Sequence, residues 1–306
     1  MNYIGPVNKN IISKFNVGHK MKIAIIQTGC WGDNVNSTLM FAPIRRKYPD
    51  STINVFTAER YHTPFVRNPH INEIIKLPSS SKNDALHLMN TVKPTGYDLV
   101  IRNHPMLNKT WSSHKNPQLG ENLILSWVNW LETNDVQYEM PLTTDLILSD
   151  EEQRAPIEFI EKLSKDRKGI VLIEAESESG QSFWNGQWTD VVARKLQTMG
   201  YIILINSVRE ASLAQNLQIM TNNRIVWVGN HTLRTIAAFY DHSDAFISVS
   251  SGLSNACNTQ QRKIIRNWIE VVNSLTCSSN VIRSTGKTFW HDNDLNKFCD
   301  WIANIL

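Results

Sequence analysis

Short apolar runs of four to six residues alternate with longer amphipathic stretches along most of this chain. Such alternation is typical of βαβ units, in which helices join parallel strands and cover both faces of the sheet. The predicted strands are 22–27, 52–57, 73–77 and 97–101 in the first half, and 169–174, 201–206, 224–228, 245–249 and 264–272 in the second. The pattern therefore predicts an α/β fold with doubly wound parallel sheets.

The alternation pauses near residue 150 and then restarts, and 306 residues are enough for two domains. We expect an N-terminal extension over 1–20, a Rossmann-like domain over 21–149 and a second one over 150–306. A last helix at 292–305 is expected to pack back on the first domain. Two such domains facing each other would enclose a ligand site in the cleft between them.

Composition excludes several classes of function. The net charge of +3 does not favour nucleic acid as a partner, without excluding it. The four cysteines form no CxxC pair and the histidines no HxxxH or HxH pair, so we predict no metal site, no disulfide framework and a cytoplasmic location. GxSxG, Walker and GxGxxG motifs are absent from the sequence, which disfavours covalent hydrolases, P-loop enzymes and nicotinamide enzymes.

The run Gln-Thr-Gly-Cys-Trp-Gly-Asp at 27–33 joins the first predicted strand to a predicted helix at 34–47. Ligands of open α/β sheets bind at this carboxyl edge. Gly29 and Gly32 allow a tight turn and the close approach of a ligand to the backbone. The start of a helix favours an ionised carboxylate, so Asp33 is suited to act as a base. A plain helix-capping aspartate fits the same pattern equally well.

Three further polar stretches follow predicted strands. Residues 250–254, Ser-Ser-Gly-Leu-Ser, could hold a diphosphate through backbone N–H groups and the hydroxyls of Ser250, Ser251 and Ser254, or could be a serine-rich helix cap. The loop 178–188 and Glu210 also lie at predicted strand ends, where an acidic residue can accept hydrogen bonds from a ribose diol. Either could instead be a solvated loop.

From Met21 onward, the order of these stretches resembles glycosyltransferase family 9, the lipopolysaccharide-core heptosyltransferases. Residues 21–33 look like the opening strand and Gly-Asp turn of that family, and 43–49 and 67–77 are similar to its next two segments. Trp184 and Trp188 lie where the family has Lys-x-Trp-Pro and a following Trp. Residues 228–233 resemble its GxTSL segment, and 248–255 resemble its S-x-D-[ST]-G-x-x-H turn.

This resemblance implies a GT-B fold and an inverting transfer of heptose or hexose from a nucleotide sugar, ADP-heptose by default, without an essential metal or other cofactor. Asp33 would be the general base, with Gly29 and Gly32 in the turn beside the reaction centre. The residues that would bind the donor are Ser182, Trp184, Glu210, His231, Leu233, Ser250, Ser251, Gly252, Leu253 and Ser254. The acceptor would meet Arg102, His104 and Trp111, in a loop at 102–118 that is suited to an anionic group or is simply solvated.

Three departures from the family pattern leave alternatives open. Ser182 stands in place of the phosphate-binding Lys, Ser250 in place of an acidic residue and Asn255 in place of a His. A lysine lost from a phosphate site removes about 1.5–3 kcal/mol of charge-assisted hydrogen bonding. The donor could therefore be another nucleotide sugar. The acceptor hydroxyl could belong to a glycan or glycolipid at the inner face of the membrane, to a protein or to a modified DNA base. A non-catalytic nucleotide-binding or glycan-binding protein is the remaining alternative.

Overall fold

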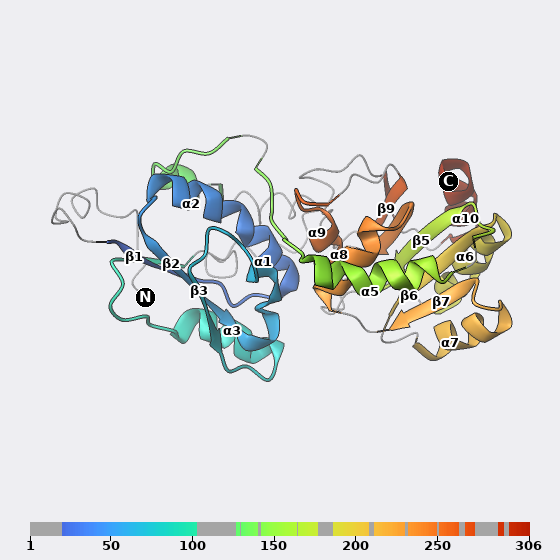
Figure 1. Ribbon diagram of the computed structural model, residues 1–306, viewed down its shortest axis with the longest axis horizontal. Helices are drawn as coiled ribbons and strands as arrows, with labels where there is room; N and C mark the ends of the chain where they lie inside the picture. Colours follow the sequence, from blue (N-terminus) through green and yellow to red (C-terminus); the bar gives the residue numbers. More distant parts are fainter. Residues whose placement is uncertain are drawn as a thin grey trace. The chain divides into compact units, whose positions relative to one another are not determined.

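The chain folds into two compact units with parallel sheets (Figure 1). The computed structural model describes residues 20–102, 127–128, 130–139, 142–163, 165–176, 186–207, 211–229, 232–249, 251–262, 267–272, 287–290 and 294–306. Described residues up to Asp145 belong to the first unit, and those from Leu146 belong to the second.

The first unit contains a four-stranded parallel sheet in the order β3-β2-β1-β4. Its strands are β1 (Lys22–Ile26), β2 (Thr52–Ala58), β3 (Glu73–Leu77) and β4 (Leu99–Ile101). Its helices are α1 (Trp31–Ser37), α2 (Phe41–Lys47) and α3 (Lys82–Thr91), with 3₁₀ turns η2 (Thr38–Met40), η3 (Glu59–Tyr61) and η4 (Thr63–Phe65). The core packs β1 and β2 against Phe41 and Ile44 of α2 and against Trp127.

The second unit contains a six-stranded parallel sheet in the order β10-β9-β8-β5-β6-β7. The strands are β5 (Gly169–Glu174), β6 (Tyr201–Asn206), β7 (Ile225–Gly229), β8 (Ala245–Val249), β9 (Asn267–Val272) and β10 (Lys287–Trp290). The helices are α5 (Asp150–Glu161), α6 (Gly186–Thr198), α7 (Ala211–Met220), α8 (Leu233–Asp241), α9 (Gly252–Cys257) and α10 (Leu295–Ile305). Strand order reverses between β5 and β8, which is the switch point where doubly wound sheets bind ligands.

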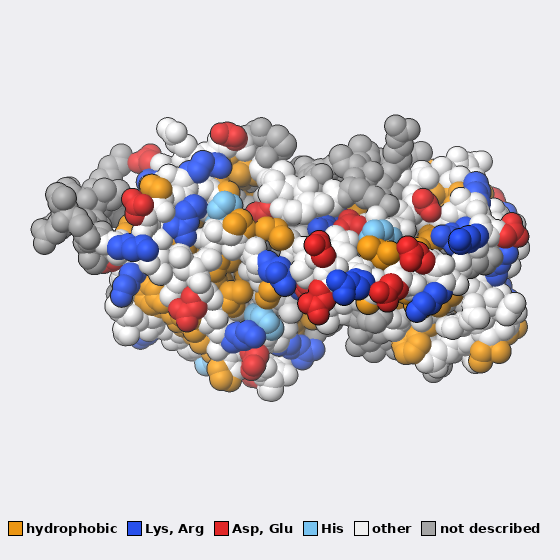
Figure 2. Space-filling model, in the orientation of Figure 1, with side chains coloured by type: hydrophobic (Ala, Val, Ile, Leu, Met, Phe, Trp, Pro, Cys, Tyr) orange, Lys and Arg blue, Asp and Glu red, His pale blue; other side chains and the backbone are white. Residues whose placement is uncertain are grey.

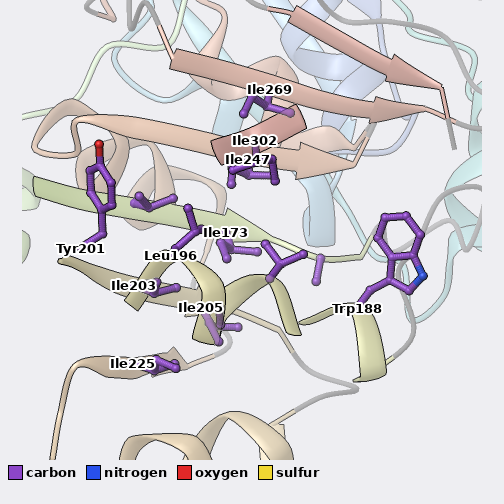
Figure 3. Packing of buried hydrophobic residues seen from close by; sticks show 14 of the residues in the cluster. Ile173, Trp188, Leu196, Tyr201, Ile203, Ile205, Ile225, Ile247, Ile269 and Ile302 are labelled. Carbon is purple, nitrogen blue, oxygen red and sulfur yellow. The ribbon is translucent and has the colours of Figure 1, made fainter. Parts of the chain in front are cut away.

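One face of the second sheet is covered by a ladder of isoleucines from neighbouring strands, labelled in Figure 3. Trp188 of α6 packs on Phe298 of α10 with ring centroids 5.2 Å apart. Phe298 and Ile302 of α10 are fully buried in this cluster. We expected the last helix to pack back on the first domain, but its apolar face belongs to the core of the second unit.

The chain passes from one unit to the other between two neighbouring residues that are both buried. The backbone N–H of Asp145 donates to Thr38 Oγ1 of the first unit at 2.7 Å. The N–H of Leu146 donates to Gln261 Oε1 at 2.9 Å, and Arg262 Nη2 donates to the Leu146 carbonyl at 3.3 Å. Each side of the junction is thus held by side chains of its own unit.

Arg234 of α8 strengthens the second half of this junction. It donates to the Ile147 carbonyl, and its Nε and Nη2 donate to the two carboxylate oxygens of Glu152 at 2.6 and 2.8 Å. Hydrogen bonds from Arg234 lower the pKa of Glu152 to about 2. The forked pair therefore stabilises the folded state while Glu152 is ionised.

The pH dependence of stability tests this pair. Because the pKa of Glu152 is depressed from 4.5 to about 2, its contribution is fully present above pH 4.5 and is lost as the pH falls toward 2. We expect Glu152→Gln to lower the free energy of unfolding by about 1–3 kcal/mol at pH 7, and this difference to shrink in denaturant titrations toward pH 3. Glu158→Gln, an exposed change on the same helix, is the matched control. A difference for Glu152→Gln that stays constant with pH would contradict the assignment.

Candidate functional site

Polar residues follow the buried strands of both sheets at their carboxyl ends. In the first unit, Ile23 to Ile26 of β1 are buried, and the chain then continues with Gln27 and Thr28, both 0% exposed. In the second unit β5 and β6 end on Glu174 and Asn206. Side chains that carry chemistry are therefore placed at the sheet edge where α/β folds bind ligands.

Asp33 lies in the first turn of α1, which begins at Trp31 rather than at the predicted residue 34. Its Oδ2 accepts a hydrogen bond of 3.0 Å from the backbone N–H of Cys30, the residue that caps the helix. The side chain is only partly buried. Asp33 is therefore a partly buried capping residue in the turn that follows β1.

Gly29 gives the Asp33 carboxylate the space that it occupies. A Cβ atom at position 29 would lie 2.7 Å from Asp33 Cβ and 2.8 Å from Asp33 Oδ2. These separations are shorter than real Cβ contacts, so a larger residue would displace the aspartate or the turn. The predicted glycine turn is thus needed for close approach of the carboxylate. Neither Gly29 nor Gly32 has a positive φ angle, so a left-handed backbone conformation does not explain why glycine occupies these positions.

Arg102, predicted to receive an anionic acceptor, has a local role. Its Nη1 donates to the Asn90 carbonyl at 2.9 Å, and its Nη2 donates to the Val92 carbonyl. These carbonyls lie at the C-terminal end of α3, which leaves its last C=O groups without helical partners. The guanidinium is therefore engaged in closing a helix end, which the sequence could not show because the two segments are 10–12 residues apart.

The turn after β8 forms a compact serine cap. Ser251 Oγ accepts from the Ser254 N–H at 3.1 Å, and Ser254 Oγ accepts from the Ser251 N–H at 3.0 Å. Ser254 Oγ also donates to the Ser251 carbonyl at 2.8 Å, and Ser254 is 0% exposed. Both hydroxyls are thus engaged inside the turn, as in the capping alternative. Gly252 and Leu253 form the first turn of α9.

Of the remaining predicted site residues, Leu233 begins α8 and is 0% exposed. The others lie outside the described residues: His104, Trp111, Ser182, Trp184, Glu210, His231 and Ser250. The structure therefore places Gly29, Gly32 and Asp33 in one turn of the first unit, and Ser251 to Ser254 in one turn of the second.

A row of buried polar residues crosses the second sheet at its switch point. Glu174 is in register with Asn206 of β6 and with Ser248 of β8, and all three are at most 5% exposed. Asn206 Nδ2 donates to Glu174 Oε2 at 2.7 Å. Beyond this row, Ser207 Oγ donates to Glu176 Oε1 at 2.9 Å. Sequence reasoning missed this group, although a charged residue that ends the apolar run 169–174 was a usable signal.

Burial shifts the titration of Glu174 toward the neutral form. Removal from water raises the pKa of its carboxyl well above 4.5, the neighbouring Glu176 carboxylate acts in the same direction, and the hydrogen bond from Asn206 opposes both. A neutral carboxyl at the end of β5 can both donate and accept hydrogen bonds.

The described residues contain no group of three or more His, Cys, Asp or Glu side chains that could hold a metal ion. Among them, no helix combines the length and the apolar character that a bilayer crossing requires. On the face drawn in Figure 2, charged side chains of both signs are interspersed, without a continuous basic stripe among the coloured, described residues.

Comparison with known proteins gives a family and a fold. Residues 66–266 match the family profile "Glycosyltransferase family 9 (heptosyltransferase)". No curated protein sequence matches the chain significantly.

Several solved structures are similar over nearly the whole chain. A glycosyl transferase family 9 structure from Veillonella parvula is 15% identical, with a TM-score of 0.66 over 94% of this chain and 90% of its own. The E. coli ADP-heptose LPS heptosyltransferase II is 14% identical, with a TM-score of 0.63 over 93% and 98%. E. coli heptosyltransferase WaaC with ADP-2-deoxy-2-fluoro heptose is 12% identical, with a TM-score of 0.60 over 93% and 99%. The predicted α/β class, a GT-B fold with two Rossmann-like domains, is confirmed.

The role of Gly29 can be tested by adding one methyl group. We expect Gly29→Ala to destabilise the protein by about 1–3 kcal/mol, because the new Cβ overlaps the Asp33 side chain. Hydrogen exchange of the peptide covering residues 27–33 should accelerate, since Cys30 N–H loses its carboxylate acceptor. Gly96→Ala is the control: its φ is +76°, but a Cβ there meets nothing within 4 Å, so it should cost about 1 kcal/mol without changing that peptide. Unchanged exchange in Gly29→Ala would refute the contact.

The raised pKa of Glu174 predicts that replacing this residue stabilises the protein by an amount that depends on pH. Because its pKa is raised, the carboxyl stabilises the fold below pH 4.5 and progressively less as the pH rises. Glu174→Gln keeps an acceptor for Asn206 and cannot ionise. We therefore expect its Tm to exceed that of the wild type by a margin that grows from pH 5 to pH 9 in thermal melts. The exposed Glu158→Gln should show no such trend, and a flat margin for Glu174→Gln would count against a raised pKa.

Proposed function

Because the chain belongs to glycosyltransferase family 9, and is thus a glycosyltransferase, we propose that it moves a heptose or related sugar from a nucleotide sugar to an acceptor hydroxyl with inversion, Asp33 being the general base. The observation that carries this proposal is the position of Asp33, a partly exposed residue in the turn after β1 whose carboxylate accepts a hydrogen bond from the Cys30 N–H at 3.0 Å. We propose that the transfer needs no essential metal, which is what the family resemblance implies.

In the proposed reaction, Asp33 takes the proton of the acceptor hydroxyl as that oxygen attacks the anomeric carbon. The bond from this carbon to the leaving diphosphate breaks, and positive charge develops on the sugar. The carboxylate stabilises this oxocarbenium-like transition state, and donors around the diphosphate stabilise the growing negative charge. Its hydrogen bond with Cys30 N–H orients the carboxylate before the substrate arrives.

We propose that the second unit binds the donor at the carboxyl edge of its sheet. Support comes from the switch point between β5 and β8. Two similar structures add to it: the E. coli ADP-heptose LPS heptosyltransferase II, and WaaC with ADP-2-deoxy-2-fluoro heptose. The hydroxyls of Ser251 and Ser254 each accept a hydrogen bond from the backbone N–H of the other residue. The turn would therefore offer the diphosphate the backbone N–H groups of Gly252 and Leu253. Donor contacts from Ser182, Trp184, Glu210, His231, Leu233 and Ser250 remain predictions.

ADP-heptose is the donor that we propose, and a glycan or glycolipid hydroxyl is the proposed acceptor. His104 and Trp111 remain predicted acceptor contacts. The proposed acceptor role of Arg102 would use the edges of its guanidinium that do not bond to α3.

Replacement of the base tests the function. We expect Asp33→Asn to lower kcat for transfer by about 10²–10⁴-fold, because an amide cannot accept the proton. Affinity for the donor should stay nearly unchanged, measured as the melting shift with ADP-heptose; a ligand at 100 times its Kd stabilises by about 2.7 kcal/mol.

Asp84→Asn is the matched control for this experiment. Asp84 holds the same position in the first turn of α3, with Oδ2 accepting from the Ser81 N–H at 3.0 Å. Both variants weaken a helix cap, and only Asp33→Asn removes the proposed base. Near-normal turnover of Asp33→Asn would refute the proposal, as would loss of turnover in both variants at temperatures where both are folded.

A further inference from the structure

We propose that Asn34 is a positioning residue for Asp33, an inference that rests on the proposed function. Asn34 directly follows Asp33 in the first turn of α1 and is 0% exposed. Asparagine is a weak helix former, and burial of its amide costs free energy unless hydrogen bonds compensate for it. An asparagine at this place therefore requires a specific reason.

The amide of Asn34 ties the turn that carries Asp33 to the neighbouring strand. Its Nδ2 donates to the Tyr61 carbonyl at 2.8 Å and to Thr57 Oγ1 at 3.3 Å. Thr57 lies near the carboxyl end of β2 and Tyr61 in η3, and both are 0% exposed. Because its two acceptors are fully buried, the anchor is a rigid part of the core.

A second, weaker tie reaches Asp33 from β1. Gln27 Nε2 donates to the Asp33 carbonyl at 3.4 Å, while the Cys30 N–H holds the carboxylate itself. The aspartate is thus held from the ends of two adjacent strands. A displacement of about 1 Å at a reacting group can cost about 10²-fold in rate, so this fixation has a direct catalytic value.

Stability alone does not account for Asn34. Its Oδ1 is buried and has no hydrogen-bond partner within the described part of the chain. A buried acceptor without a partner costs free energy, which offsets what the two donor bonds contribute. The part of the side chain that acts is therefore the Nδ2 group, whose two hydrogen bonds fix the turn beside the proposed base.

The chain offers a close control in Asn54. This amide is also buried, at 8% exposure, and its Oδ1 also has no partner among the described residues. Its Nδ2 makes two donor bonds, to Glu73 Oε2 at 3.0 Å and to Tyr97 OH at 2.9 Å. Asn54 lies in β2 of the same sheet, and neither of these two bonds reaches the turn at 27–34. The two amides thus differ mainly in what they hold.

The experiment compares Asn34→Ala with Asn54→Ala in full-length protein, with ADP-heptose as donor. Both should lower the Tm by similar amounts. At a temperature where both are folded, we expect Asn34→Ala to lower kcat by about 10–100-fold with a donor KM within about twofold of wild type, whereas Asn54→Ala keeps kcat within about twofold. Asn34→Ser, which retains a small polar side chain without the amide nitrogen, replaces Asn34→Ala if that variant does not fold.

A double variant decides whether Asn34 acts through Asp33. In the Asp33→Asn background, Asn34→Ala should lower the residual kcat by less than about twofold, because residues that act as one unit are not additive. Equal kcat in Asn34→Ala and Asn54→Ala, or the same loss with and without Asp33, would overturn the inference. If Asp33→Asn itself keeps normal turnover, the proposed function fails; if only the Asn34 variants do, this inference fails alone.

Discussion

Both sheets are parallel and their central strands are buried, and this constraint determines where polar chemistry can occur. All residues of β5 and β6 are buried, as are the last four of β1. Water cannot reach polar groups along such strands, so polar side chains are confined to the strand ends. Asp33, Glu174 and Asn206 all lie at or just beyond the carboxyl end of a strand. The fold thus positions the candidate site before any ligand contact is considered.

At Asp33, one contact serves both the observed helix cap and the proposed catalytic role. The sequence left two alternatives, a capping aspartate and a base, and the hydrogen bond from Cys30 N–H makes them compatible. A carboxylate that caps its own helix is already oriented before substrate binds. No long, flexible side chain has to be immobilised at that step. This arrangement requires glycine at position 29, because no larger residue fits beside the carboxylate.

The sequence predicted 169–174, 201–206 and 245–249 to the residue, because fully buried parallel strands are short apolar runs. The strand 73–77 also matches to the residue, although it is only partly buried. Signals that depend on distant partners were missed. Glu174 and Asn206 meet across 32 residues, and Arg102 closes a helix end elsewhere in the chain. The helix beginning at Trp31 was placed too late because its cap is Cys30, a residue type seldom found there. Strand β10 was not predicted.

The passage of the chain from Asp145 to Leu146 has a mechanical consequence. Each of these neighbours is hydrogen-bonded within a different unit, so no slack separates the two anchors. Any force that pulls on the chain at this point would therefore act directly on these hydrogen bonds, since no flexible linker lies between the two residues to absorb it.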